Sequence, residues 1–440
     1  MSDKSMQNEV KHENGSSKPS TIELVNKNLA KRYRAEKRFR AYGIASILFG
    51  LACLVVLFTD IIGKGHTAFM QTEVYLDIDL SAEQLDISDI NDANQVAAAD
   101  YQGVIKKALR ERFPEVKGRR DKRKLYSVVS NGAGFTLRGM LESDPSLLNQ
   151  KMGVWLLADD DIDTYYKTLG DGDAFTGRMS EKQQSWIASL IEEDQIKKSF
   201  NTTFFTAGDS REPEQAGIHG AIMGSLFTLL VTIVLSFPIG VAAAIYLEEY
   251  APKNKFTDFI EVNINNLAAV PSIIFGLLGL AIFIGFFEMH RSIPLVGGFV
   301  LTLMTLPTII ISSRAAIKAV PPSIREAAMG IGASKMQVVL HHVLPLAMPG
   351  MLTGAIIGFA QALGETAPLL MIGMVAFIVD IPGGVTDPAT ALPVQIFLWS
   401  DSPERAFVER TSAAIMVLLA FLIAMNTLAV WLRKRLERRW

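Results

Sequence analysis

Glu365 is the charged residue of this sequence whose surroundings most need a chemical explanation. It follows Gly364 and precedes Thr366 and Pro368 inside a long apolar stretch. A carboxylate in hydrocarbon costs several kcal/mol, so it should face the protein interior or water. The glycine and the proline can distort a helix and free backbone groups beside the charge. We interpret the segment as part of a translocation path or gate; the alternative is an interhelical hydrogen bond or ion pair that fixes packing. The candidate residues are Gly364, Glu365, Thr366 and Pro368.

A partner for Glu365 is not evident in the sequence. The basic residues that we consider as partners are Arg314 and Lys318, which stand at the end of one apolar run. An ionised carboxylate would also repel an anion. We therefore expect any partner of Glu365 to come from a second subunit.

A second group of carboxylates, Asp159 to Asp161 with Asp163, has the residue type that binds calcium. An EF-hand loop that begins at Asp159 would need glycine at its sixth position and glutamate at its twelfth. Thr164 and Gly170 stand there instead. We interpret the cluster as a solvated acidic turn and predict no metal site.

No pattern in the sequence predicts an enzyme. The phosphate-binding motif G-x-x-x-x-G-K-[ST] is absent, and Gly332-Ala333-Ser334-Lys335 only mixes its residue types. No catalytic triad or pair of carboxylates in a soluble cleft is evident, and the single cysteine, Cys53, lies in an apolar run. We therefore predict no catalytic residues, no intrachain disulfide and no cofactor bound by this chain.

A polar, helix-compatible stretch, residues 326–345, separates two apolar runs of membrane length. Its alanines offer a close-packing face, its glycine can end or turn a helix, and its proline is suited to starting the next one. A short helix between two spans can transmit motion from a bound motor. The residues that we predict to form this coupling surface are Glu326, Ala327, Ala328, Gly332, Leu344 and Pro345.

Composition and charge predict the elements that position these residues. With 49% hydrophobic and 20% charged residues, and with long uncharged stretches, the 440-residue chain indicates an integral membrane protein. Basic residues crowd 31–40 and 433–439, beside apolar runs, which favours both termini in the cytoplasm. This arrangement requires an even number of crossings. The predicted spans are residues 41–62, 217–246, 264–287, 294–317, 347–378 and 411–432.

The long polar segment 64–215 predicts one compact domain of mixed α/β character outside the membrane. Residues 71–80 alternate apolar and polar side chains, as in a half-buried strand, and 152–158 indicates a second strand. Residues 94–113 and 181–200 are predicted to be helices. A basic run, 117–124, lies in this segment, where long translocated domains escape the charge rule.

Two other classes of membrane protein fit parts of the pattern. A sensor or receptor also has an anchor, an external domain and a return span, but it would need a cytoplasmic signalling domain after residue 247. A secondary transporter or channel usually shows paired repeats with broken helices, and no convincing second copy is present.

The stretch 326–345 resembles the E-A-A loop of ABC importer permeases. Together with G-E-T-A-P-L-L at 364–370, A-L-P-V-Q-I-F at 391–397 and P-I-G-V-A-A-A-I-Y-L-E-E-Y at 238–250, it is similar to the PstA family of phosphate importer permeases. The resemblance covers residues 216–440. His342 departs from the pattern, since an aliphatic residue usually stands there.

The resemblance implies an all-α polytopic inner-membrane protein of the type I ABC importer permease fold, with six transmembrane helices and an α/β periplasmic insert domain. It implies inward transport of phosphate, or of another oxyanion, and three partners: a PstC-like sister permease, a PstB-like ATPase dimer that binds ATP and Mg²⁺, and a PstS-like periplasmic phosphate-binding protein. The expected parts are a cytoplasmic tail (1–40), a first helix (41–63), the insert (64–215) and the permease (216–440) with its coupling loop (319–345).

Overall fold

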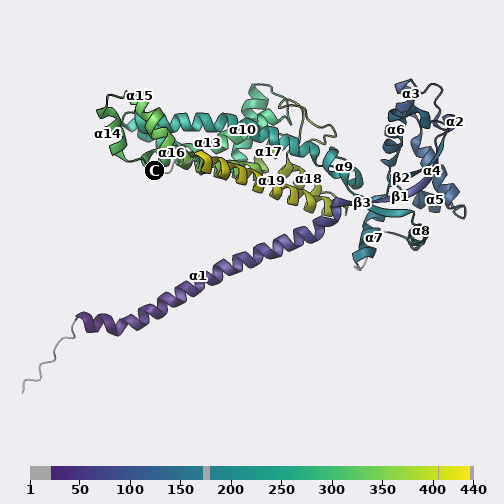
Figure 1. Cartoon of the computed structure of the whole chain (residues 1–440), viewed down its shortest axis with the longest axis horizontal. Helices are drawn as coiled ribbons and strands as arrows, with labels where there is room; N and C mark the ends of the chain where they lie inside the picture. Colours follow the sequence, from purple (N-terminus) through teal and green to yellow (C-terminus); the bar gives the residue numbers. More distant parts are fainter. Residues whose placement is uncertain (1–20, 172–178, 405, 437–440) are drawn as a thin grey trace, which may run out of the picture. The chain divides into compact units, whose positions relative to one another are not determined.

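The computed structural model describes residues 21–171, 179–404 and 406–436 (Figure 1). Residues 1–20 of the expected cytoplasmic tail lie outside this range. The chain divides into two compact units, Met1–Asp60 and Ile61–Trp440. The described part of the first unit belongs to one helix, α1 (Thr21–Gly65). Its residues from 41 to 60 are predominantly apolar, as in a helix that crosses a membrane.

Among the described residues, five helical segments are long and apolar enough to cross a membrane, and a bent pair raises the number to six. This agrees with the six predicted crossings in number, and the chain has a predominantly helical membrane fold. The five segments are Lys31–Phe69, His219–Tyr250, Pro294–Lys318, Lys335–Gly364 and Ala406–Arg435.

The third predicted span, 264–287, is wrong as a continuous helix. The structure has α11 (Lys255–Ala268), then α12 (Ser272–Gly279) and the π-helical η5 (Leu280–Phe286), with a bend of 101° between the two parts. Pro271 lies at the bend with an extended backbone. Because the residue before a proline avoids helical geometry, α11 ends here and the chain changes direction.

The fifth predicted span, 347–378, is wrong at both ends. Helical structure begins earlier, with α15 (Lys335–Gln337) and the π-helical η6 (Val338–Val343), and continues through α16 (Leu344–Gly364). After α16 the chain breaks, forms the short α17 (Ala367–Met371), and has no regular element until α18 (Leu392–Ser400).

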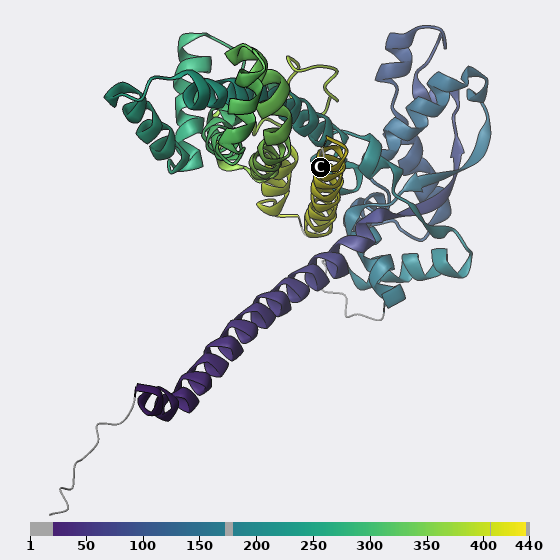
Figure 2. The same cartoon turned by 60° about the vertical axis from the view of Figure 1, so that its left-hand side comes forward.

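The permease core is built from α10 (His219–Ile245), α13 (Pro294–Lys318) and α16, which pack against one another. The last helix, α19 (Ala406–Leu436), packs on α16 and α18 (Figure 2). Small side chains let these backbones approach: a Cβ on Gly240 would lie 2.6 Å from a methyl of Ile309. Membrane helices commonly pack through such small residues because lipid supplies no hydrophobic drive between them.

The insert contains a three-stranded antiparallel sheet in the order β2-β1-β3. β1 (Met70–Asp79) is central, with β2 (Lys151–Leu157) and β3 (Ile196–Phe200) on either side. Val74, Leu76 and Ile78 are buried, so the predicted alternation of the first strand is confirmed. Both predicted strands are present, and the sheet has its own apolar core.

The predicted helix 181–200 is wrong in its second half. Helix α8 ends at Glu192, and residues Ile196–Phe200 form β3, which pairs with β1. The predicted helix 94–113 is interrupted, and the structure has two helices there, α3 (Ala93–Ala98) and α4 (Tyr101–Arg112).

The other elements of the insert and its connections are η1 (His66–Phe69), α2 (Ala82–Leu85), α5 (Arg119–Tyr126), α6 (Ala133–Ser143), η2 (Pro145–Leu147), α7 (Asp160–Asp171), α8 (Glu181–Glu192), α9 (Thr202–Thr206) and η3 (Pro213–Gln215).

Candidate functional site

The coupling loop starts with a nine-residue helix, α14 (Pro322–Gly330), that carries the E-A-A triplet. Glu326 and Ala327 are exposed, whereas Ala328 is buried in an apolar cluster with Ala244, Ile317 and other residues of the neighbouring helices. The triplet therefore has one residue that fixes the helix to the permease core. Its other two residues are free to meet a partner.

Gly332 turns the chain after α14. Its φ of +87° is a left-handed conformation that side chains with a Cβ rarely adopt. The N–H of Gly332 donates to the carbonyl of Met329 at 2.9 Å, and the N–H of Ala333 donates to that of Ala328 at 3.1 Å. These bonds satisfy carbonyls at the end of α14. Ser334 then caps α15, so the predicted turn at Gly332 is confirmed.

Pro345 lies in the first turn of α16, as predicted, but α16 follows the π-helical η6 directly, without a loop between them. Helical structure runs without interruption from Lys335 to Gly364. Pro345 follows the π-helical η6, and its missing N–H leaves a carbonyl of the preceding turn without a helical donor. Leu344 and Pro345 are both half-buried. They hold the C-terminal side of the loop against the permease rather than ending it.

Three apolar side chains of the coupling loop are exposed, and we call them the apolar tip, although the sulfur of Met336 accepts a hydrogen bond from the Tyr250 hydroxyl at 3.4 Å. Met329 is 53% exposed, Ile331 83% and Met336 56%. Contiguous exposed apolar patches are a feature of protein–protein interaction sites. The predictions from sequence missed it, although all three residues lie within the predicted stretch 326–345.

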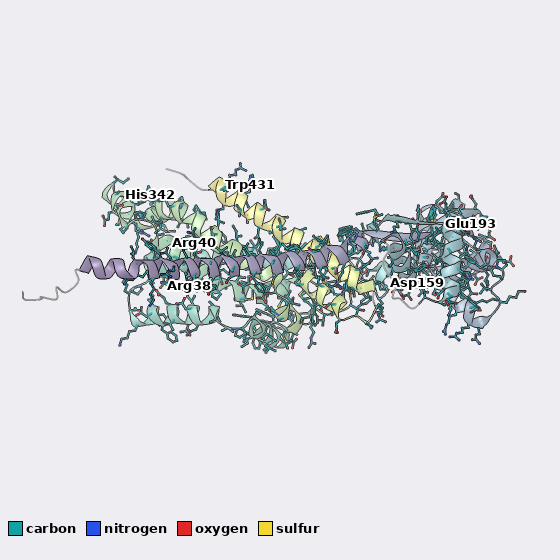
Figure 3. The ribbon with its side chains drawn as sticks, turned by 90° about the horizontal axis from the view of Figure 1, so that it is seen from below. Arg38, Arg40, Asp159, Glu193, His342 and Trp431 are labelled. Atoms are coloured by element: carbon teal, nitrogen blue, oxygen red, sulfur yellow. The ribbon has the colours of Figure 1, made fainter. Side chains whose placement is uncertain are left out.

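A cavity of about 810 Å³ lies next to the loop. It is lined by the end of α13 (Ala316, Ala319), the start of α14 (Pro321, Ile324), and His342 and Pro345 on η6 and α16. His342, the residue that departs from the family pattern, thus faces a hollow and not a packed core. Figure 3 shows His342 and Asp159 at opposite ends of the permease helices.

Ion pairs brace the loop against the end of α10, where the π-helical η4 (Tyr246–Tyr250) carries two carboxylates. Arg325 of α14 donates to Glu249 at 2.7 Å and also to the carbonyls of Ile317 and Val320. The sequence signal for this brace was the pair Glu248-Glu249 after a 27-residue apolar helix, and sequence reasoning did not use it.

Arg314 and Lys318 are engaged on the same side of the molecule. Arg314 contacts Glu261 at 2.5 Å and Glu248 at 3.5 Å, and Lys318 contacts Glu248 at 3.5 Å. These pairs occupy both basic residues, so neither serves as the partner of Glu365. They stabilise the loop end of the permease.

Glu365 sits at the break between α16 and α17, not inside a helix. Its backbone is extended (φ −79°, ψ 122°) and its side chain is half-buried. Across the break, Pro368 packs on α12, where a Cβ on Gly276 would lie 2.7 Å from the proline Cα. No hydrogen bond or ion pair joins the Glu365 carboxylate to another side chain within residues 21–171, 179–404 and 406–436. The expectation of a partner from another subunit remains a prediction.

Two interrupted segments pack together next to this break: α17, which follows the α16–α17 break, contacts α12, which follows the α11–α12 bend. Interrupted helices expose backbone N–H and C=O groups, and in membrane proteins these are tolerated where they are buried in protein or line a water-filled path. Gly364, Thr366 and Pro368 all belong to this break. The structure brings the four candidate residues together at one point of the permease.

The acidic cluster lies at the start of α7 and not in a turn, which corrects that prediction. Asp159, Asp160 and Asp161 are half-buried, and Asp163 is buried. Asp163 accepts from the N–H of Thr72 at 2.8 Å and from Lys167 at 2.6 Å. Carboxylates suit the first turn of a helix because its free N–H groups carry partial positive charge.

This end of α7 forms a buried junction between the insert and α19. Lys167 contacts Asp163 at 2.6 Å and Glu409 of α19 at 3.2 Å. Removing one partner of a buried ion pair is strongly destabilising, because the other charge stays buried without compensation. The sequence signal was a Glu-Arg pair in the first turn of the last apolar run.

A second contact completes the junction. Arg410 of α19 is buried, donates to the backbone carbonyl of Glu214 at 3.3 Å, and lies 5.6 Å from the centre of the Phe204 ring. The carboxylate of Glu214 accepts a short hydrogen bond from Ser130. Burial raises the pKa of Glu214 to about 7, although the Ser130 bond opposes the rise. Burial, then the charge of Asp160, also raises the pKa of Asp159.

These raised pKa values predict that the purified protein is more stable near pH 5 than near pH 8. Between pH 4.5 and about 7 the folded state holds a proton on Glu214 that the unfolded state releases, so the free energy of unfolding falls as pH rises through this window. The expected loss is on the order of 3 kcal/mol. Thermal unfolding at several pH values measures it.

Glu214→Gln should flatten this pH dependence, because it removes the titrating group and keeps the shape. Glu181→Gln, at an exposed carboxylate of α8, is the matched control and should retain the wild-type slope. The same slope in both variants would show that Glu214 does not hold the proton.

Comparison with known proteins identifies the family. Residues 236–440 match the model of the binding-protein-dependent transport system inner membrane component, and residues 26–174 match a domain of unknown function, DUF3333. The phosphate transport system permease protein PstA of Mycobacterium leprae is 30% identical over 232 residues, covering 52% of this chain and 74% of the relative.

Two further relatives are also permeases of this kind. PstA of Haemophilus influenzae is 30% identical over 222 residues, covering 50% of this chain and 77% of its own. The probable ABC transporter permease protein YqgI of Bacillus subtilis is 29% identical over 249 residues, covering 53% and 84%. Members of this family are permease subunits, which are transport components and not catalysts. The chain therefore belongs to the PstA family of ABC transporter permeases.

Proposed function

We propose that this chain forms half of the membrane pathway of an ATP-driven importer of inorganic phosphate. The observation that carries the substrate is the identity of about 30% to relatives named as phosphate transport permeases. A PstC-like permease would supply the other half, a PstB-like ATPase dimer would bind ATP and Mg²⁺, and a PstS-like protein would deliver phosphate.

The coupling loop supports a separate ATPase as the motor. Its apolar tip is exposed, its helix is anchored through Ala328, and Arg325 ties it to α10. A docked ATPase that moves the tip would thereby move two transmembrane helices together. We assign the break at Glu365 to the pathway, because transporters commonly have broken helices at their substrate sites.

The test is reconstitution of the chain with its three partners in liposomes. ATP-dependent uptake of labelled phosphate, but not of sulfate or molybdate, is the expected result. ATP-dependent uptake of another oxyanion without phosphate uptake would contradict the assigned substrate. A kinase or cyclase in place of the ATPase among co-purified partners would instead support a sensor.

We also propose that both termini are cytoplasmic and that the insert is periplasmic. The prediction is tested by single cysteines in a chain that lacks Cys53, which is exposed on α1. A cysteine at Lys151 of the insert should react with an impermeant reagent in intact spheroplasts, and one at Lys335 of the coupling loop should react only after lysis. Reaction at 335 from outside would refute this topology.

Glu365→Gln should reduce phosphate uptake several-fold while assembly stays normal. The change keeps the shape of a half-buried side chain at the helix break and removes its charge, so it separates electrostatics from packing. Uptake and subunit co-purification are measured together from pH 6 to 8. Glu83→Gln, at an exposed carboxylate of the insert, is the control. Full uptake at every pH would reduce Glu365 to a replaceable hydrogen-bonding group.

A further inference from the structure

The insert carries a strongly basic surface that the proposed transport pathway does not use. Residues 106–124 contain ten lysine and arginine residues against three acidic ones, which leaves a net charge of +7. Six of the basic side chains are exposed on α4, α5 and the connection between them. We call these six the basic face: Lys106, Arg110, Lys117, Arg119, Arg120 and Arg123.

The two helices form one continuous surface. Arg110 donates to the hydroxyl of Tyr126 at 3.5 Å, and Lys106 lies 5.9 Å from the same ring, so the basic residues of α4 border the end of α5. Leu109 and Leu125 point from the opposite sides of these helices into the core of the insert. The fold therefore turns the charges outward.

Few carboxylates pair with the cations of the basic face, so most of its positive charge is not neutralised. Arg112 pairs with Glu193 and Lys107 with Asp79, and both of these cations lie outside the basic face. The one acid of α5, Asp121, is bonded to Lys182 of α8 at 2.6 Å. This contact lowers the pKa of Asp121 and brings a further cation to the helix. Within the described residues, Lys117, Arg119 and Arg123 form no ion pair.

Such a concentration of like charge destabilises the fold through self-repulsion, so an external counter-charge would relieve it. A single phosphate ion fits poorly, because the cations stand on the exposed sides of two helices and line no described cavity. An extended acidic surface fits better, since α5 alone offers a row of charges about 12 Å long.

The position of the basic face indicates from where a partner arrives. Figure 1 shows α4 and α5 on the side of the insert that lies away from the permease helices. In Figure 3, Glu193, the partner of Arg112 at the end of α4, lies at that same end of the insert.

We propose that the basic face is a docking surface for a soluble protein with an acidic face. Resting on the proposed function, that protein is the phosphate-binding protein of the importer. Exposed charges of this kind accelerate association and add little to the lifetime of the complex. The insert would thus collect the loaded binding protein and release it readily after delivery.

The test measures the association rate of the purified phosphate-binding protein with the complete transporter in nanodiscs of uncharged lipid. Arg119→Glu/Arg123→Glu reverses two exposed charges and should slow association about ten-fold at low salt. The difference should vanish near 0.5 M salt, where the screening length is roughly 4 Å. Glu111→Gln/Glu115→Gln removes the two exposed acids beside the basic face and should accelerate association.

Lys151→Glu is the matched control, because Lys151 is exposed on β2 outside the basic face, and it should leave the rate unchanged. If wild type imports phosphate and all variants associate at its rate, the docking proposal alone is wrong. If the double reversal abolishes only binding to vesicles of anionic lipid, the surface recognises membranes and the proposal is also wrong. A wild-type complex that neither imports phosphate nor binds the phosphate-binding protein would overturn the proposed function and this proposal together.

Discussion

Replacement of Ile331 by aspartate is expected to abolish ATP-driven phosphate uptake while the permease stays folded. Ile331 is 83% exposed at the apolar tip, so the free permease loses almost no packing when it is changed. In a docked complex the aspartate would be buried against an apolar surface without a partner, which costs several kcal/mol. Each 1.4 kcal/mol weakens binding ten-fold, so the ATPase should dissociate during purification.

The measurement combines ATPase co-purification with uptake in liposomes. Ser323→Asp introduces the same charge at an exposed position of α14 outside the apolar tip, and it should leave both quantities near the wild-type level. Retained co-purification with lost uptake would show that the tip acts in motion transfer and not in docking. Normal uptake by Ile331→Asp would exclude the tip from the ATPase contact.

Local sequence patterns predicted those elements whose stability has a local cause. The alternation of β1 produced a strand because Val74, Leu76 and Ile78 bury one face of it. The turn at Gly332 was predictable because only glycine adopts a φ of +87° without strain. Five of the six crossings followed from length and apolarity, which are properties of a segment and not of its neighbours.

Features that depend on distant partners were not predictable. Residues 196–200 have no strong strand pattern, and they form β3 because β1, more than a hundred residues earlier, offers a free edge. The bend before α12 could have been inferred from Pro271, but apolarity alone concealed it. The junction depends on Lys167 and Glu409, which are 242 residues apart in sequence.

The candidate site also combines features that local sequence predicts with features that only the fold reveals. The E-A-A triplet was found from sequence because it lies in a polar stretch between two apolar runs, and the residues around Glu365 were found because a charge is unusual in an apolar setting. The geometry that gives them a role was not available: the exposure of Ile331, the extended backbone at Glu365 and the partner of Arg325 all require the fold.

Arg325→Ala is expected to reduce uptake by about a hundred-fold through loss of the brace between α14 and α10. The guanidinium makes two bonds to Glu249, of 2.7 and 3.0 Å, and two to the carbonyls of Ile317 and Val320. The side chains of the pair are only 20% and 11% exposed. Removal of one partner from a largely buried pair costs about 3 kcal/mol, because the other charge is left without compensation.

Lys318→Ala provides the contrast. Its ammonium also pairs with a carboxylate of η4, Glu248, but the lysine side chain is 59% exposed. Exposed pairs contribute about 0–1 kcal/mol, so uptake should change little. Glu249→Gln combined with Arg325→Met should recover part of the loss, since neither charge is then left alone. The two changes should therefore be non-additive in a double-mutant cycle.

The cycle tests how the loop is coupled to the membrane helices. If the brace transmits the motion of the ATPase, uptake should fall in Arg325→Ala while ATPase co-purification persists, because the apolar tip is intact. Equal losses of co-purification and uptake would mean that the brace only positions the tip. Strict additivity of the two changes would show that Arg325 and Glu249 act independently, and α10 would then have no direct part in coupling.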